Sequence, residues 1–254
     1  MASKTKNTTK GFTSNDTRNE RRHRLAGNMN FAASEAYKLL RTNLMFSFSD
    51  NGKCHIIGMT SSFRGEGKSL TSINLAYTLA ESNKKVLLIE GDMRLPTFSG
   101  RLRLNAAPGL SNVLAGINTT DEAIQPFVID ADADDALQVD VMVSGDIPPN
   151  PSELLGSEHA AGLFNLLRGK YDYIIFDLPP VTAVTDALVV SKLVDGIVVV
   201  VRNNHAVRGA LAETIRQLKL VDAHILGFVF NGATESGSSY YKGKSYYKGN
   251  YYKK

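Results

Sequence analysis

The feature that most constrains this chain is a glycine-rich loop at residues 61–69, with the sequence S-S-F-R-G-E-G-K-S. An apolar run at residues 55–59 precedes the loop, and a helical pattern at residues 68–81 follows it. A strand, such a loop and a helix form the setting of a P-loop, whose backbone N–H groups and helix dipole attract phosphate. The sequence therefore predicts an α/β fold that binds phosphate at this loop.

Each position of the loop has an expected part in that binding. Gly65 and Gly67 permit a tight backbone, Lys68 reaches the β- and γ-phosphates, and the Ser69 hydroxyl ligates Mg²⁺. Ser62 stands where the usual G-x-x-x-x-G-K-[ST] motif has its first glycine. The loop residues predicted to bind ATP are Ser62, Phe63, Arg64, Gly65, Glu66, Gly67, Lys68, Ser69 and Leu70.

Apolar runs and helical patterns alternate along the rest of the chain. Continuous apolar strands with helices between them predict a mostly parallel sheet that is covered by helices on both faces. The further predicted strands are residues 86–89, 139–143, 173–176, 197–201 and 225–230. The other predicted helices are residues 31–48, 151–167, 183–193 and 207–220.

The charge of the chain lies mainly at its two ends. The 254 residues carry a formal net charge of +4; residues 1–30 carry +5 and residues 232–254 carry +4, which leaves −5 for residues 31–231. Both ends have few aliphatic residues, so we interpret 1–30 as a disordered basic segment, 31–231 as the folded domain and 232–254 as a flexible tail. The acidic stretch at residues 130–135 is predicted to be a surface loop. An acidic domain argues against nucleic acid as a partner.

The tail contains three tyrosine pairs separated by Gly, Ser, Asn and Lys. The tyrosines are Tyr240, Tyr241, Tyr246, Tyr247, Tyr251 and Tyr252. The single cysteine, Cys54, fits a reducing cytoplasm, and we find neither a secretory signal nor an apolar stretch long enough to span a bilayer. We therefore expect a cytoplasmic protein.

Charged residues follow two of the predicted strands. Asp177 ends one of them and begins an Asp-Leu-Pro-Pro sequence, while Glu90, Asp92 and Arg94 follow another at alternate positions. The carboxyl ends of parallel strands face the ligand crevice, so Asp177 matches the Walker B acid that holds Mg²⁺. If the extended conformation continued, Glu90, Asp92 and Arg94 would lie on one side of the chain.

Together these residues resemble the bacterial tyrosine kinases of capsule and exopolysaccharide operons, a branch of the deviant P-loop ATPases related to cell-division and partition ATPases. The resemblance rests on the G-E-G-K-S loop, the alternating acids and arginine of a second Walker motif, and the D-x-P-P sequence. It extends through residues 35–41, residues 145–155 and the tyrosine-rich tail. It implies a P-loop NTPase fold, the cofactors ATP and Mg²⁺, and a non-specific protein-tyrosine kinase that phosphorylates its own tail.

The resemblance also implies a role for each site residue. Glu90, which replaces the family's usual aspartate, would accept the proton of the incoming tyrosine. Asp92 and Asp177 would hold Mg²⁺ together with Ser69, and Arg94 would orient the acids or the phosphate. Two residues at later strand ends, Arg202 and Asn231, are further expected to bind the nucleotide.

The partners implied by the resemblance lie at the membrane and in other copies of the chain. A transmembrane polysaccharide co-polymerase would activate the kinase and recruit it to the inner face of the membrane, and a cognate phosphatase would reverse the modification. Copies would form a ring and phosphorylate one another in trans. The residues expected at the ring contact are Glu35, Lys38 and Arg41, at i, i+3 and i+6 on one helical face, with Lys38 in place of the family's arginine.

Two other functions remain open. A non-kinase ATPase switch of the partition type shares the fold and the nucleotide site, although it usually has a signature lysine at the position of Phe63. A kinase-like scaffold, weakened by Glu90, would act by binding alone. An anti-phosphotyrosine blot of the purified protein would separate both from a kinase.

Overall fold

The computed structural model describes residues 29–48, 53–129 and 137–233 of the chain. The predicted basic segment up to residue 28, the acidic loop and the tail tyrosines lie outside the described residues. Among the helices of the described part, none is both long enough and apolar enough to cross a lipid bilayer.

The centre of the fold is a seven-stranded sheet in the order β3-β4-β2-β5-β1-β6-β7. The strands are β1 (His55–Ser61), β2 (Val86–Glu90), β3 (Ile124–Ile129), β4 (Leu137–Met142), β5 (Tyr173–Asp177), β6 (Gly196–Arg202) and β7 (Ile225–Asn231). All neighbours run parallel except β3, which is antiparallel to β4 at the sheet edge. The predicted mostly parallel sheet is confirmed.

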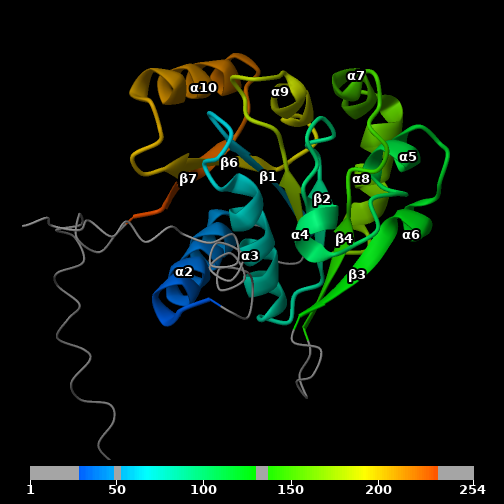
Figure 1. Cartoon of the computed structure of the whole chain (residues 1–254), viewed down its shortest axis with the longest axis horizontal. Coiled ribbons are helices and arrows are strands. Elements are labelled where there is room, and N and C mark those ends of the chain that lie inside the picture. The colour runs from blue at the N-terminus through cyan, green and yellow to red at the C-terminus, as the bar shows by residue number, and fades with distance from the viewer. Residues whose placement is uncertain (1–28, 49–52, 130–136, 234–254) are drawn as a thin grey trace, which may run out of the picture.

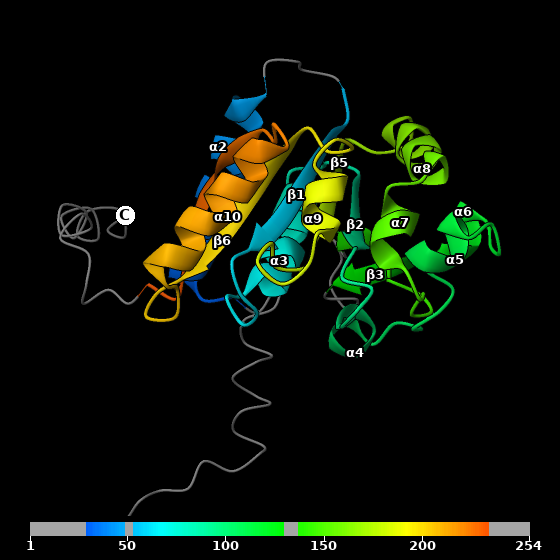
Figure 2. The ribbon, with the colours of Figure 1, turned by 90° about the horizontal axis from the view of Figure 1, so that it is seen from above.

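Helices cover both faces of this sheet. They are α2 (Phe31–Ser47), α3 (Lys68–Ala80), α4 (Phe98–Leu102), α5 (Leu110–Leu114), α6 (Thr120–Ala123), α7 (Pro151–Leu155), α8 (Glu158–Arg168), α9 (Asp186–Val190) and α10 (Arg208–Leu220). Figure 1 shows α2 alongside α3, and in Figure 2 helices α7, α9 and α10 lie in front of the strands.

Two apolar clusters form the core, one on each face of the sheet. In β1, Ile56 belongs to the cluster beneath α8 and α9, whereas Ile57 belongs to the cluster beneath α3. Successive side chains of a strand point to opposite faces, so continuous apolar runs serve both clusters. Eleven residues of α3 are buried, because α2 covers the side of α3 that the sheet leaves open.

The structure corrects several predicted elements. The helix predicted over residues 151–167 is two helices, because Gly156 ends α7 and the Ser157 side chain caps α8 by accepting from the Ala160 N–H. Only Asp186–Val190 of the helix predicted at residues 183–193 is helical. The sequence analysis missed β3, which contains Pro126 and lies at the sheet edge where proline is tolerated.

Candidate active site

The glycine-rich loop connects β1 to α3 at the carboxyl edge of the sheet. Gly65 and Gly67 have φ angles of 82° and 91°, in the left-handed region that glycine adopts without strain. Gly67 is also the N-cap of α3, so the loop delivers Lys68 and Ser69 at the start of a 13-residue helix. The predicted strand, loop and helix are therefore all present in the expected order.

Side chains on both sides hold the loop in place. The Ser62 hydroxyl accepts a hydrogen bond from Thr214 in α10 at 3.0 Å, and the Ser62 carbonyl accepts one from Thr182. The buried Glu66 carboxylate accepts from the Phe63 N–H at 2.9 Å. Ser62 and Glu66 thus stabilise the loop conformation, while Phe63 remains partly exposed.

Two predicted nucleotide-binding residues reach the loop from the ends of β6 and β7. Arg202 donates to the Gly65 carbonyl at 3.0 Å, and the Asn231 amide donates to the Glu66 carbonyl at 2.9 Å. Arg202 and Asn231 are opposite each other in the parallel register of β6 and β7. The sheet therefore brings both side chains against the P-loop, from residues far apart in the sequence.

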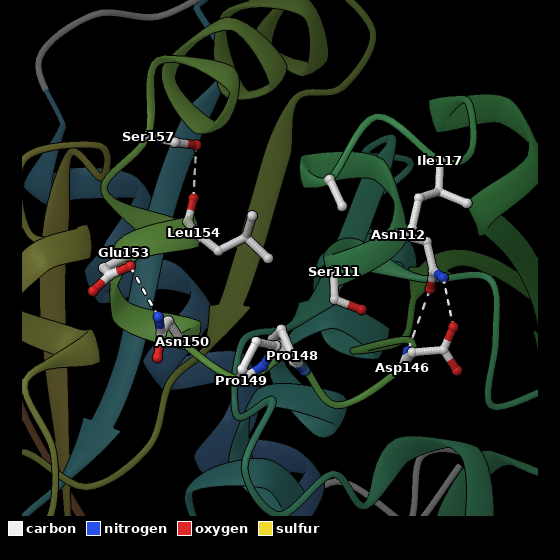
Figure 3. A pocket seen from close by; sticks show the side chains of 11 residues that line it. Ser111, Asn112, Ile117, Asp146, Pro148, Pro149, Asn150, Glu153, Leu154 and Ser157 are labelled. Carbon is white, nitrogen blue, oxygen red and sulfur yellow. Dashed lines mark hydrogen bonds between the residues drawn. The ribbon is translucent and has the colours of Figure 1, made fainter.

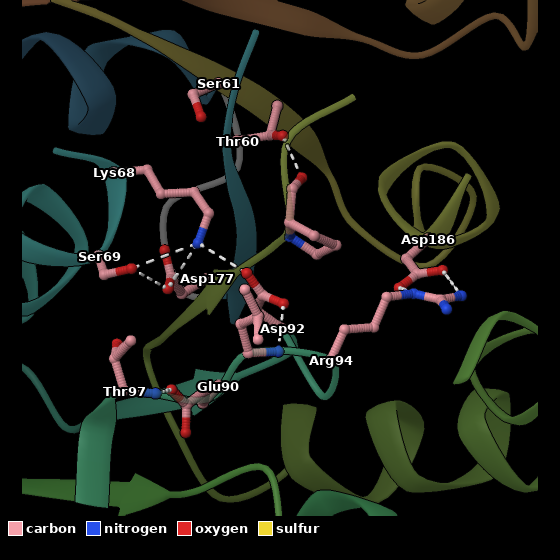
Figure 4. Close-up of polar contacts among 12 residues, drawn as sticks. Thr60, Ser61, Lys68, Ser69, Glu90, Asp92, Arg94, Thr97, Asp177 and Asp186 are labelled. Atoms are coloured by element: carbon pink, nitrogen blue, oxygen red, sulfur yellow. Dashed lines mark hydrogen bonds and ion pairs between the residues drawn. The ribbon is translucent and has the colours of Figure 1, made fainter. Parts of the chain in front are cut away.

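The Lys68 ammonium lies among oxygen atoms from three separate segments (Figure 4). Its Nζ is 3.2 Å from Asp177 Oδ2 and 3.6 Å from Asp92 Oδ2, and 3.3 Å from the Ser69 hydroxyl. Ser69 itself donates to Asp177 Oδ2 at 2.7 Å. The parallel sheet places the ends of β1, β2 and β5 side by side, which is why these residues meet.

Ser72 is a site residue that the sequence analysis missed. Its hydroxyl lies 3.0 Å from Asp177 Oδ1 and 3.0 Å from the Lys68 carbonyl, and the side chain is buried. Ser72 follows Ser69 by three residues, so both hydroxyls face the same side of α3. The three-residue spacing from Ser69 is the sequence signal that could have identified Ser72 as a site residue.

The oxygen atoms around Lys68 also suit a divalent cation. Carboxylates and a serine hydroxyl are hard ligands of the kind Mg²⁺ prefers, and Mg²⁺ usually takes few protein ligands beside water and phosphate. The position already accommodates the positive charge of Lys68. The described residues contain no cluster of three His, Cys, Asp or Glu side chains that could hold a metal by themselves.

Backbone N–H groups bind the carboxylate of Glu90. Its carboxylate accepts from the N–H groups of Thr97 and Phe98, the latter at 2.8 Å, and from the Ser144 N–H at 3.3 Å, and its exposed fraction is 1%. Burial raises the pKa of Glu90 above its ordinary value, which the three N–H groups oppose and nearby Asp177 reinforces. Backbone donors thus occupy both carboxylate oxygens. The part of proton acceptor, which the resemblance implies for Glu90, stays a prediction.

The expectation that Glu90, Asp92 and Arg94 share one side is wrong. Strand β2 ends at Glu90, so the extended conformation does not continue through Arg94. Arg94 turns away from Lys68 and pairs with the buried Asp186 at 3.1 Å (Figure 4). It also donates to Ser152 at 3.1 Å, and so connects this loop with α7 and α9. The hydrogen bond with Asp186 raises the pKa of Arg94.

The three residues of α2 do not share one face either. Lys38 pairs with Glu35 at 3.1 Å on the exposed side, whereas Arg41 donates to the Thr78 carbonyl of α3 at 2.7 Å. Six residues make about 1.7 helical turns, so Arg41 is rotated away from Glu35. Arg41 therefore attaches α2 to the domain in this structure.

Comparison with known proteins identifies similar chains. The family model described as an AAA domain matches residues 54–226. The tyrosine-protein kinase YwqD of Bacillus subtilis is 36% identical over 208 residues, which cover 82% of this chain and 84% of that protein. The solved kinase domain of the Escherichia coli tyrosine kinase ETK is 31% identical with a TM-score of 0.73, covering 82% of this chain and 79% of that domain.

A more distant likeness concerns the fold alone. The septum site-determining protein MinD of Pyrococcus horikoshii is 24% identical with a TM-score of 0.57, covering 72% of each chain. The nucleotide-binding architecture is thus shared widely, while the higher identities are found among tyrosine kinases.

Proposed function

Because the chain belongs to the bacterial tyrosine kinases and is itself a tyrosine-protein kinase, we propose that it transfers the γ-phosphoryl group of ATP to tail tyrosines of a neighbouring copy. The acceptors are the three tyrosine pairs between residues 240 and 252. By its family, the reaction serves the synthesis and export of capsular or exopolysaccharide. The partition-type alternative has weaker support, because the likeness to such proteins extends to the fold alone.

One observation carries the assignment of the site. Lys68, Asp92 and Asp177 come from three distant segments, yet the Lys68 ammonium is within 3.6 Å of both carboxylates. A buried group of this composition fits phosphoryl transfer, which needs positioning and charge neutralisation rather than covalent chemistry by the protein.

We assign roles to these residues as follows. Lys68 would exchange its carboxylate partners for the phosphates of ATP, and Ser69, Asp92 and Asp177 would hold Mg²⁺. When bound, Mg²⁺ neutralises charge on the phosphates. The tyrosine oxygen bonds to the γ-phosphorus, the bond from that phosphorus to the β–γ bridging oxygen breaks, and ADP, phosphotyrosine and a proton result. Arg202 and Asn231 fix the loop that cradles the phosphates.

Glu90 and Arg94 are assigned to positioning. The Glu90 carboxylate orders the backbone at residues 97–98 and 144, and Arg94 ties the loop after β2 to Asp186. These roles replace proton acceptance by Glu90 and orientation of the acids by Arg94.

The outer side of α2 supports contact between copies. Phe31, Leu39 and Phe46 are 76%, 53% and 86% exposed, which is unusual for large apolar side chains gathered on one helix. The Glu35–Lys38 pair is exposed on the same helix and can exchange partners with a neighbouring copy. We propose that α2 is part of a ring contact.

A membrane partner completes the proposal. A transmembrane co-polymerase of the polysaccharide pathway would activate the kinase and bring it to the inner face of the membrane, and a phosphatase would remove the phosphate. The net charge of −5 on residues 31–231 gives no support to a nucleic-acid partner.

The test mixes two full-length chains with ATP and Mg²⁺. One carries Lys68→Met and keeps its tail tyrosines; the other keeps Lys68 and has all six tail tyrosines replaced by phenylalanine. Mass spectrometry should find phosphotyrosine on the tail of the Lys68→Met chain in the mixture, and none when that chain is alone. Lys170→Met, which alters an exposed ion pair with Asp121, is the matched control and should behave as the parent chain.

Two results would contradict the proposal. Phosphotyrosine on the tail of the parent chain, but on neither chain of the mixture, would restrict the reaction to a chain's own tail. No phosphotyrosine in any mixture or in the parent chain would favour the scaffold function instead.

A further inference from the structure

A cavity of about 490 Å³ opens between α5, the loop after β4 and α7 (Figure 3), at the same carboxyl edge of the sheet as the candidate active site. Its size is within the range of sites that hold small ligands or side chains. The loop approaches α5 closely at Gly145, where φ is 80° and an added Cβ would lie 2.7 Å from the Ser111 hydroxyl oxygen. The cavity wall is thus built by a contact that only glycine permits.

One buried polar atom of this wall has no partner. Ser111 is 4% exposed and lines the cavity, yet its hydroxyl makes no hydrogen bond with any described residue. Buried hydroxyls nearly always have a partner, because desolvation without one costs roughly 1–3 kcal/mol. A ligand with a hydroxyl or amide group would satisfy Ser111.

The rest of the lining combines apolar surface with negative charge. Pro148, Pro149 and the 71% exposed Ile117 supply the apolar part. Asp146 and Glu153 are both exposed at the cavity, and no lysine or arginine is among the lining residues. Each carboxylate accepts one hydrogen bond from an asparagine and has further acceptor capacity. The chemistry suits a ligand with an aromatic ring, a hydroxyl and an adjacent positive charge.

The tail of the chain has this chemistry in repeated form. Residues 240–242 and 246–248 each have the sequence Tyr-Tyr-Lys, residues 251–253 repeat it, and residues 232–254 carry +4. Tyrosine has an apolar ring and a hydroxyl, and the lysine that follows provides the cation.

The spacing of the repeats also matches the geometry of the sheet. The cavity lies at the carboxyl end of β4, three strands from β1 and its P-loop, which is about 14 Å at the usual strand spacing. Successive tyrosine pairs are six and five residues apart, and such segments span at most about 20 Å when extended. A tail with one pair at Lys68 can therefore place the next pair in the cavity.

We propose that this cavity is an anchoring subsite that binds one Tyr-Tyr-Lys repeat of the tail while a tyrosine of the adjacent repeat is phosphorylated. The Ser111 hydroxyl donates a hydrogen bond to the bound tyrosine or accepts one from it. The carboxylates of Asp146 and Glu153 attract the lysine ammonium. The inference rests on the proposed function, since it specifies how that substrate is held.

The test measures phosphorylation of a synthetic peptide, residues 238–254, by full-length chains whose own six tail tyrosines are replaced by serine. Two variants alter the cavity: Glu153→Lys reverses a charge, and Ala115→Trp fills the space from an exposed position at the end of α5. Each should raise KM for the peptide about tenfold and change kcat by less than about twofold. Glu81→Lys, an equal charge reversal at the exposed end of α3, is the control and should leave both constants unchanged.

A second peptide isolates the anchoring step. With Tyr246, Tyr247, Tyr251 and Tyr252 all replaced by serine, the peptide retains only one pair. In the chain with an unaltered cavity, the KM for this peptide should already be higher than the KM for the full peptide. The Glu153→Lys and Ala115→Trp changes should not raise it further. Equal KM values for the full peptide in the parent, Glu153→Lys and Ala115→Trp chains would overturn the inference.

Direct binding separates this inference from the proposed function. If no chain phosphorylates the peptide, the proposed function fails, but fluorescence anisotropy of the labelled peptide still decides whether the cavity binds it. About tenfold weaker binding to both variants supports the subsite, and unchanged binding refutes it. A change in particle mass with unchanged peptide binding would assign the cavity to contact between copies and would also refute the subsite.

Discussion

Ser72 shows how much a single hydroxyl contributes to this site. It lies 3.0 Å from the second oxygen of Asp177, while Ser69 binds the first. We expect Ser72→Ala to lower the autophosphorylation rate about tenfold and to increase the Mg²⁺ concentration needed, because residues that orient metal ligands typically have such effects. The measurement is the initial rate as a function of Mg²⁺ concentration.

Ser82→Ala is the control for Ser72→Ala. The Ser82 hydroxyl follows the end of α3 and donates to the Leu79 carbonyl of that helix, so the Mg²⁺ dependence should not change. An identical Mg²⁺ dependence in the Ser72→Ala and parent chains would show that Asp177 is held without Ser72.

Activity measurements on Glu90 variants can distinguish a positioning role from a role as general base. If it positions the backbone, Glu90→Gln keeps an accepting oxygen and should retain activity to within about tenfold; loss of a general base would lower the rate by about 10²–10⁴. Glu90→Ala should lose the contacts to Thr97, Phe98 and Ser144 altogether and unfold at a lower temperature. Autophosphorylation rates of the two variants, with thermal melts, provide the measurement.

The raised pKa of Glu90 also predicts how stability depends on pH. Its carboxyl binds a proton more tightly in the folded state than at the unfolded value of 4.5, so its contribution is fully present below that value. The contribution is lost as pH rises through the folded pKa. The free energy of unfolding of the parent should therefore fall relative to Glu90→Gln as pH increases above about 4.5. Urea unfolding at a series of pH values tests this, and a constant difference would contradict it.

At the scale of elements, the long periodic segments were predictable and the short ones were not. The sequence located α2, α3, α10 and the parallel strands, because long apolar patterns survive in any packing. It missed α4, α5 and α6, which have four or five residues each and are stabilised by their neighbours in the fold.

The site shows the same division. The positions of Lys68, Ser69 and Asp177 follow from a loop and from strand ends, and both can be recognised in sequence. The turn of Arg94 toward Asp186 could not be predicted, because it depends on where β2 ends and on a partner 92 residues away. The contacts of Glu90 could not be predicted either, because no sequence pattern indicates that backbone N–H groups would occupy its carboxylate.

The attachment of α2 gives a prediction for this element. Arg41→Ala removes the hydrogen bond to the Thr78 carbonyl, which should cost about 1.5–3 kcal/mol and lower Tm by roughly 3–12 °C for a domain of this size. Lys38→Ala removes only an exposed pair and should change Tm little. Thermal melts of both variants give the comparison, and equal shifts would show that Arg41 does not attach the helix.

At the scale of the whole molecule, charge connects phosphorylation with assembly. Residues 232–254 carry +4, and each phosphate adds about −1.5 to −2 charges at neutral pH. Three phosphates would therefore reverse the sign of the tail, and the tails of neighbouring copies would repel one another. Light scattering should find smaller particles after incubation with ATP. The decrease in size should be less at high salt, because salt screens exposed charges. An unchanged particle mass would refute the coupling.

The order of the strands has a consequence for the symmetry of any assembly. The chain enters its tail from β7 at one edge of the sheet, whereas the cavity beside β4 lies five strands away, about 24 Å. If one copy's tail enters another's cavity, the giving and receiving surfaces differ. The contact is then either a reciprocal exchange of tails about a two-fold axis or a heterologous contact. Heterologous contacts close only when their rotation divides a full turn, and otherwise grow into filaments. In a closed assembly every copy both gives and receives, so all copies should reach the same phosphate content, whereas an open one would leave a terminal tail unmodified.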